Sequence, residues 1–170
     1  DVCSSDLGNT MKGRKIVAFF LMICLLIASV SVRAEENGEV VDGSRLTNDQ
    51  EVIGSTLTNA GARGTYLGTG SAKLSNNGNH VLNVWGNTTC NRTCDRVKVT
   101  LHLQKLVSGT WTTVTTLDTK VAYNTNYVSN SRNVTVTGGY YYRISGTHVA
   151  VKGKTTESTY SSTDGMWVSK

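Results

Sequence analysis

Cys90 and Cys94 are the residues whose type and spacing most directly suggest chemistry. In an exported chain, two such cysteines are expected to form a disulfide. The bond would close a short loop and stabilise the fold by only about 2 kcal/mol, so it would fix a local turn. Free thiols and a metal site are the alternatives, but a structural zinc site needs four ligands, and neither His80 nor His102 stands at a recognised spacing. We therefore expect the disulfide.

Constellations of catalytic residues are missing from the sequence. A serine hydrolase presents its nucleophile on a sharp turn such as Gly-x-Ser-x-Gly, which does not occur in this chain. A glycosidase needs two carboxylates that flank one cleft. Asp118 and Asp164 instead lie in or near predicted turns, where aspartate is expected for backbone reasons. We expect no enzyme, no cofactor and no metal ion.

His148 is a candidate because of the parity of its neighbours. Tyr142 and Ile144 share one face of a predicted strand, whereas Val149 and Val151 have the opposite parity. This change predicts a β-bulge between the two pairs. Bulges redirect side chains and are frequent at functional sites, which makes His148 a candidate binding residue, although a polar surface or edge histidine that satisfies a local hydrogen bond is the favoured interpretation.

A basic strand face provides further candidates. From Arg96 to Val107, apolar residues alternate strictly with polar ones, which predicts a strand with one buried face and one exposed face. The exposed face carries two cations and a histidine, which suit an anionic ligand. The full set of candidate binding residues is Arg96, Lys98, His102, Trp111, Tyr141, Arg143 and His148.

Trp111 follows a predicted turn at Ser108 and Gly109. A two-residue turn would pair it with Leu106 on the exposed face and leave an apolar ledge, whereas a three-residue turn would place it beside Val107 in the core. We favour the core, because one well-packed tryptophan buries about 200 Å². The 3 tryptophans and 7 tyrosines of the chain would nevertheless suffice for a surface on which sugars stack.

The elements that position these residues are predicted to be strands. They are expected around residues 80–86, 96–107, 111–117, 133–137, 140–145, 155–162 and 166–168, with turn residues between them and no strongly helical window. Val52, Ile53 and Leu57 could add an edge strand. The pattern predicts an all-β fold, a single antiparallel β-sandwich of immunoglobulin-like or jelly-roll type.

The N-terminal part of the chain is expected to be an export signal and a leader. Basic residues after Met11, the apolar run 16–32 and a small residue at Ala34 have the order of a signal peptide. We predict upstream or adapter-derived residues at 1–10, the signal peptide at 11–34, a flexible acidic leader at 35–63 and the β-sandwich at 64–170. A genuine N-terminal extension at 1–10 and an uncleaved membrane anchor at 16–32 are the alternatives.

The distribution of charge narrows the choice of partner. Eight of the 12 acidic residues precede Ile53, and 12 of the 17 basic residues follow it. A solvated face is the simpler explanation of a basic body, and a polyanion partner such as wall teichoic acid or a polysaccharide is the more specific one. Nucleic acid is not expected, because export would separate the chain from it and no binding motif is present. Membrane contact is expected only through the signal peptide before cleavage.

Three segments resemble a family of small secreted proteins from Gram-positive bacteria. They are Thr89–Asp95, the hairpin Val99–Val114 and Gly139–Thr163, and the resemblance covers most of Tyr66–Trp167. It implies a signal peptide and one β-domain, and it carries no activity over to this chain.

Together these features predict a secreted, non-enzymatic protein that binds a cell-wall or other extracellular polymer, anionic or carbohydrate. The alternative is a secreted antagonist, either a bacteriocin-like protein or an inhibitor of a secreted enzyme, which would contact a protein or a membrane. A large flat apolar patch would favour this second prediction, and a concave face with aromatic residues would favour the first.

Overall fold

The computed structural model describes residues 45–56 and 64–170. Its elements are β1 (Leu46–Thr47), β2 (Glu51–Ser55), β3 (Leu67–Asn76), β4 (Val81–Val107), β5 (Thr110–Thr116), β6 (Lys120–Thr135), β7 (Tyr140–Lys152), β8 (Thr155–Ser162) and β9 (Gly165–Val168). In these two segments no helix has the length and apolar character needed to cross a membrane. The predicted all-β class is confirmed. The expected signal peptide at 11–34 and the residues at 1–10 lie outside the described segments.

The nine described strands belong to one hydrogen-bonded sheet. Its main path has the order β1-β9-β7-β4-β3-β2, while β5 and β6 pair with β4, and β8 pairs with β7. Every described pair is antiparallel except β1 with β9, which run parallel. The expectation of purely antiparallel strands is therefore wrong for this pair. The sequence did not predict the pairing, because β1 lies within 35–63, the segment expected to be a leader.

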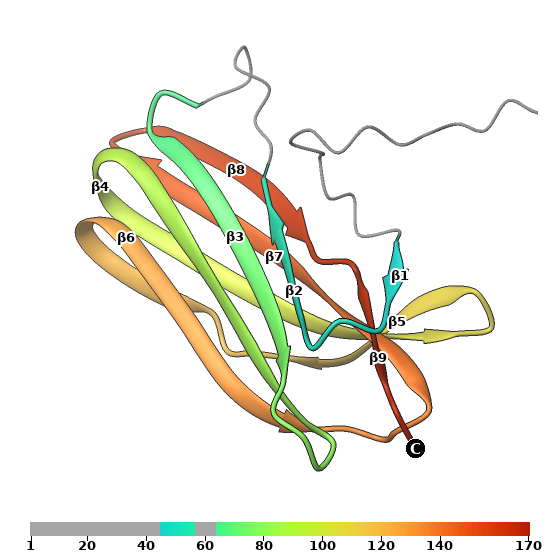
Figure 1. Ribbon diagram of the computed structural model, residues 1–170. Coiled ribbons are helices and arrows are strands. Elements are labelled where there is room, and N and C mark those ends of the chain that lie inside the picture. The colour runs from blue at the N-terminus through green and yellow to red at the C-terminus, as the bar shows by residue number, and fades with distance from the viewer. Residues whose placement is uncertain (1–44, 57–63) are drawn as a thin grey trace, which may run out of the picture. The chain divides into compact units, whose positions relative to one another are not determined.

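The long strand β4 makes the sheet curl. Its first half pairs with β3 and β6, whereas its second half pairs with β7 on one side and with β5 and β6 on the other. The register with β6 shifts between Thr89 and Cys94, where β4 turns back on itself. Figure 1 shows the result, with β3 and the first half of β4 lying in front of β7. Two strands predicted separately, around 80–86 and 96–107, are thus one bent strand.

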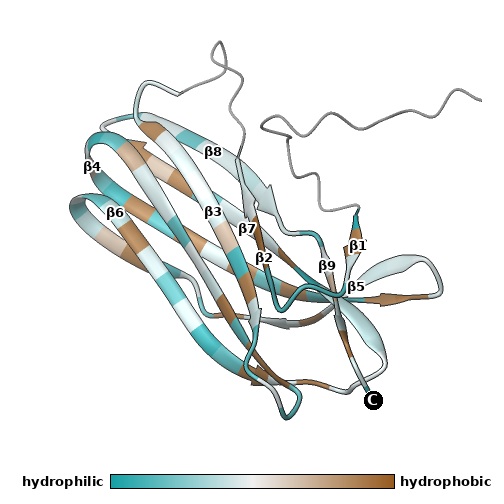
Figure 2. Ribbon diagram, in the orientation of Figure 1, coloured by the Kyte–Doolittle hydropathy of each residue, from teal (hydrophilic) through white to brown (hydrophobic). Residues whose placement is uncertain are grey.

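The core lies between the two facing halves of the curled sheet. Val97, Val99, Leu101 and Leu103 of β4 are fully buried and alternate with partly exposed polar residues, which confirms the predicted period of two. Figure 2 shows this alternation as brown and teal bands along the strand. The opposite half contributes the buried side chains Ala72, Leu74, Leu82 and Val84. The alternation therefore places the polar residues of β4 on an outer face.

The expected bulge is absent from the pairing of β7 with β4. β7 pairs with the second half of β4 without a register shift, so the predicted change of parity is wrong. Tyr142 and Ile144 are buried as predicted, and the inward positions continue through His148 and Ala150. The valines at the outward positions are only partly buried. Apolar parity was misleading here because a polar residue occupies an inward position.

β2 lies within the segment 35–63, which was expected to be a leader. It pairs with β3 over its whole length and stands at the end of the strand order, which confirms the edge strand expected at Val52 and Ile53. Leu57, the third residue of that expectation, lies outside the described segments. Val52 is buried, whereas Ile53 is exposed. The sheet therefore begins within the segment 35–63, where the few apolar residues form too short a pattern to define a strand.

Candidate functional site

Four large side chains gather on the outer face of the half of the sheet that contains β7 and β9. Tyr141 and Trp167 are cross-strand partners, and their ring centroids lie 4.9 Å apart. The guanidinium carbon of Arg143 lies 4.4 Å from the ring centroid of Trp111, and Arg143 Nε donates a hydrogen bond to Gln104 Oε1 at 2.8 Å. All four side chains are partly exposed. We call Trp111, Tyr141, Arg143 and Trp167 the aromatic ledge.

A tight turn places Trp111 on this face. Ser108 and Gly109 have φ angles of 50° and 78°, the pair of positive values that a type I′ hairpin turn requires. Leu106 consequently pairs with Trp111, so the favoured core position is wrong and the two-residue turn is the register found. The indole packs over Gly165, where an added Cβ would lie 2.8 Å from a ring carbon.

The aromatic ledge combines two chemical capacities. Aromatic rings that are half-exposed can cover the apolar face of a ligand while their polar atoms stay in water. The Arg143 side chain is already held between Trp111 and Gln104, so it would lose little rotamer freedom when it bound a carboxylate, phosphate or hydroxyl group. The arrangement therefore suits a ligand with both apolar faces and polar groups.

Arg96 and Lys98 extend the same outer face toward the bend in β4. Their cross-strand neighbours on β6 are Tyr123, whose exposed fraction is 67%, and Val121. Neither cation forms an ion pair with a residue of the described segments, and Arg96 Nε is buried without a hydrogen-bond partner. We call Arg96 and Lys98 the basic row. Within the described segments, no ion pair neutralises its positive charge.

His102 lies between the aromatic ledge and the basic row. Its Nδ1 atom is 2.8 Å from Thr116 Oγ1, and the ring is partly exposed. The structure therefore brings six of the seven predicted binding residues onto one face, namely Arg96, Lys98, His102, Trp111, Tyr141 and Arg143. Trp167 completes the ledge, and the sequence does not indicate this role, because only the pairing of β9 with β7 brings Trp167 beside Tyr141.

His148 is the exception, because it is fully buried between the two halves of the sheet. Its Nε2 atom lies 2.8 Å from Ser161 Oγ, and its Nδ1 atom lies 2.9 Å from Thr88 Oγ1. The hydroxyl of Thr88 donates its one proton to the carbonyl oxygen of Lys98 at 2.8 Å. Nδ1–H must therefore donate to Thr88, and Nε2 must accept from Ser161. The prediction that His148 belongs to a binding face is wrong.

The contact of His148 with Ser161 is structural. Burial lowers the pKa of His148 to about 4, and a hydrogen bond from the ring to the backbone carbonyl of Asn87 offsets this effect only in part. Ser161 is itself buried, so its hydroxyl is closed to a substrate. The polar pair satisfies its own hydrogen bonds within the core, as buried polar groups must.

Cys90 and Cys94 lie at the bend of β4 as buried thiols. Burial, followed by a hydrogen bond with the Cys94 thiol, raises the pKa of the Cys90 thiol above its ordinary value. A thiol of this kind is a weak nucleophile and metal ligand. Within residues 45–56 and 64–170, no three His, Cys, Asp or Glu side chains gather where they could hold a metal ion. The two sulfur atoms are neighbours, and the disulfide stays a prediction.

Glu157 performs a structural role that the sequence did not reveal. Its carboxylate accepts hydrogen bonds from the backbone N–H groups of Thr65, Tyr66 and Leu67 at 2.9, 3.0 and 2.7 Å. These contacts fasten the beginning of β3 to β8. No local pattern indicates them, because the partners are about 90 positions apart in the sequence.

A comparison with known proteins places the chain in a family. The family of unknown function DUF6147 matches residues 36–166, a range that includes the basic row and most of the aromatic ledge. No curated protein matches the chain significantly. The expected likeness to a domain family without an assigned activity is confirmed, whereas origin and export stay predictions. The chain belongs to the DUF6147 family.

Proposed function

We propose that the protein is secreted and binds an extracellular polymer, a glycan that carries acidic groups, along the outer face of β4, β5, β7 and β9. The observation that carries this proposal is the aromatic ledge. Large aromatic side chains that gather on the surface, held by cross-strand pairing and by Arg143, form an ordered patch of the kind that marks interaction sites. The unneutralised basic row on the same face supports an anionic ligand.

The length of the face supports a polymer over a small molecule. Arg96 and Gln104, which contacts Arg143, are eight residues apart on β4, which corresponds to about 26 Å at about 3.3 Å per residue. One sugar unit cannot reach from the aromatic ledge to the basic row. In the proposed complex, sugar rings contact the exposed edges and faces of the aromatic ledge, and acidic groups further along the chain meet Arg96 and Lys98.

The proposal has a fold component and an export component. We propose that the curled sheet is a β-sandwich whose two layers share β4 and β6, which cross from one layer to the other at their bends. We propose also that residues 11–34 are a cleaved signal peptide, which would bring the domain to the polymer.

Export and disulfide formation are tested together by the mass of the exported protein. Expressed with its own leader, the protein should begin at Glu35 and be two hydrogens lighter than the reduced chain, because Cys90 and Cys94 oxidise outside the cytoplasm. Intact-mass measurement of the culture medium checks both results. A membrane-bound product that retains residues 16–32 would contradict export, and two titratable thiols would contradict the bond.

Binding is tested by retention on purified cell-wall glycan. Replacing Trp111 and Trp167 together by alanine should weaken retention about ten-fold or more, since two aromatic contact surfaces and the support of Arg143 are lost and about 1.4 kcal/mol corresponds to ten-fold. Trp85→Ala is the matched control, because Trp85 lies on the outer face of the other half of the sheet, beside Lys73 and Ser131. It should retain wild-type binding.

The electrostatic part of the proposal is tested by the dependence of retention on salt. Wild-type retention should fall as salt is added, because charges separated by more than about 8 Å are screened at physiological ionic strength. Arg96→Gln combined with Lys98→Gln should weaken retention at low salt and flatten this dependence. If neither the tryptophan variant nor the basic-row variant changed retention at any salt concentration, this face would not be the binding surface.

A further inference from the structure

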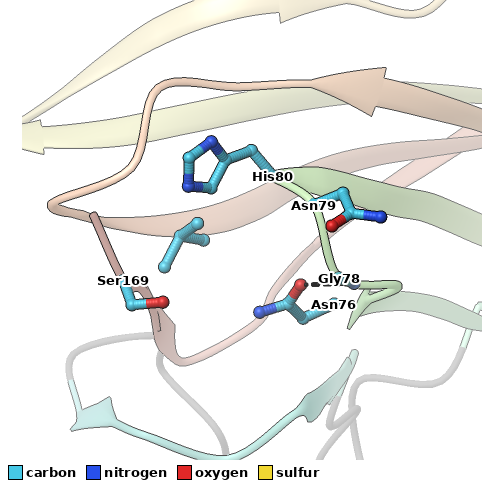
Figure 3. A pocket seen from close by; sticks show the side chains of 6 residues that line it. Asn76, Gly78, Asn79, His80 and Ser169 are labelled. Atoms are coloured by element: carbon cyan, nitrogen blue, oxygen red, sulfur yellow. Dashed lines mark hydrogen bonds between the residues drawn. The ribbon is translucent and has the colours of Figure 1, made fainter.

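A cavity of about 460 Å³ lies at one end of the curled sheet, between the β3–β4 hairpin and the end of β9. Its lining residues are Asn76, Gly78, Asn79 and His80 from the hairpin, and Val168 and Ser169 from β9 and the residue after it. Figure 3 shows this cavity from close by. None of the lining residues belongs to the aromatic ledge. The two sites are separate even on β9, where Trp167 is partly exposed on the outer face and its neighbour Val168 is buried.

The hairpin wall of the cavity has an unusual backbone. Gly78, Asn79 and His80 have φ angles of 79°, 50° and 59°, so three successive residues adopt the left-handed region. Asn79 and His80 are not glycine, so this conformation costs them steric energy. Hydrogen bonds from Asn77 N to the carbonyl oxygen of Val81 and from Val81 N to that of Gly78, each 2.9 Å, hold the wall in place. Such strained segments cluster at ligand sites, where they aim polar groups.

Several polar groups face the cavity with unused capacity. Asn76 Oδ1 accepts a hydrogen bond from Gly78 N at 3.0 Å, which orients the amide and leaves Nδ2 to donate. Figure 3 shows the side chains of Asn76, His80 and Ser169 around a common space. Neither the His80 ring nor the Ser169 hydroxyl has a hydrogen-bond partner in the described segments. The cavity therefore presents an amide donor, a hydroxyl and an imidazole, and Val168 adds an apolar residue to the lining.

The chemistry of the lining selects a class of ligand. The six lining residues include no carboxylate, ammonium or guanidinium group, so none of these groups is present to form an ion pair with a charged ligand. Groups that donate and accept at several angles match a ligand rich in hydroxyls. The volume falls at the small end of the range of about 300 to 1,000 Å³ for small-molecule sites. We propose that this cavity binds one neutral sugar unit, either a free sugar or the terminal unit of a glycan.

The proposal is tested by NMR titration of the protein with glucose, galactose and N-acetylglucosamine, with glucuronate as the charged comparison. At least one neutral sugar should shift the backbone signals of residues 76–80 and 168–169, and glucuronate should bind more weakly. Asn76→Asp keeps the acceptor for Gly78 N but replaces the Nδ2 donor. His80→Asn removes the imidazole while supplying a residue that tolerates a positive φ. Each variant should weaken sugar binding about ten-fold.

Two controls make the outcome specific. Asn124 also has a positive φ, 49°, but lies at the bend of β6, so Asn124→Asp should bind the sugar with wild-type affinity. The variant that lacks Trp111 and Trp167 should also bind it normally, because the cavity does not depend on the aromatic ledge. The inference is overturned if no neutral sugar shifts the hairpin signals, if glucuronate binds better than every neutral sugar, or if Asn76→Asp and His80→Asn bind as well as the wild type.

A further titration separates the two sources of the sugar unit. Equal affinity for a monosaccharide and for a trisaccharide that ends in it assigns the cavity to free sugar. Higher affinity for the trisaccharide assigns it to the end of a glycan. Either result supports a sugar site, and neither depends on retention of the protein by cell-wall polymer.

Discussion

Lowering the pH from 6.5 should destabilise the folded protein by a total of about 3 kcal/mol as His148 becomes protonated. Burial lowers the pKa of His148 from 6.5 in the unfolded chain to about 4 in the fold. The unfolded state therefore binds a proton more tightly, and each unit of difference in pKa is worth about 1.4 kcal/mol. This contribution is fully present above pH 6.5 and is lost as the pH falls toward 4. Urea unfolding across this range measures it.

A substitution identifies the group responsible for the loss. Glu51 and Asp95 also have lowered pKa values, so they too lose stabilisation in acid, but only below their ordinary values of 4.5 and 3.8. The interval from 6.5 to 4.5 therefore reports on His148. His148→Gln, which stays neutral, should be less stable than the wild type at neutral pH but should show little change across this interval. A wild-type stability that is flat there would refute the assignment.

Gly70→Ala should destabilise the domain by about 3 kcal/mol, at the upper end of the range for overpacked cores. The added methyl group would overlap the imidazole of His148, which lies directly over Gly70 from the opposite half of the sheet. The backbone of Gly70 cannot retreat easily, because its N–H donates to Thr56 Oγ1 and its carbonyl oxygen accepts from Thr56 N, both at 2.8 Å. Urea unfolding of the variant at neutral pH checks this value.

A double-mutant cycle separates overlap from any other effect of the new methyl group. In the background of His148→Ala, the space left by the ring accepts the methyl group, so Gly70→Ala should then cost much less. The two substitutions should therefore be strongly non-additive, as expected for residues in direct contact. Additive costs would show that Gly70 and His148 do not share this space.

The outer face could be predicted because its signal is local. Alternation within the single strand from Arg96 to Val107 is enough to place Arg96, Lys98 and His102 on one side, whichever strands become its neighbours. β8 could also be predicted from the local sequence, and its predicted bounds of 155–162 agree with those of the structure.

The position of Trp111 depended on a turn whose residues gave a weak signal. A type I′ turn is usually marked by Asn-Gly or Gly-Gly, whereas here Ser108 takes a φ of 50°. Adding one residue to the turn would have moved the tryptophan to the other face. The ledge also needed the pairing of Tyr141 with Trp167, which the fold brings together from β7 and β9.

His148 could not be placed from sequence because its partners are distant in the chain. Thr88 and Ser161 satisfy both ring nitrogens, and Gly70 provides the space, yet these residues come from three other strands. Locally, the apolar Val149 is the better candidate for an inward position, and that comparison produced the wrong parity. Burial of a polar residue is decided by its partners, which periodicity does not reveal.

The indole N–H signals of the three tryptophans test most directly whether the aromatic ledge contacts the polymer. On titration of ¹⁵N-labelled protein with purified cell-wall glycan, the signals of Trp111 and Trp167 should shift with a common midpoint. The signal of Trp85, on the outer face of the other half of the sheet, should stay in place. A shift confined to Trp85, or three unchanged signals at saturating polymer, would contradict the proposed binding face.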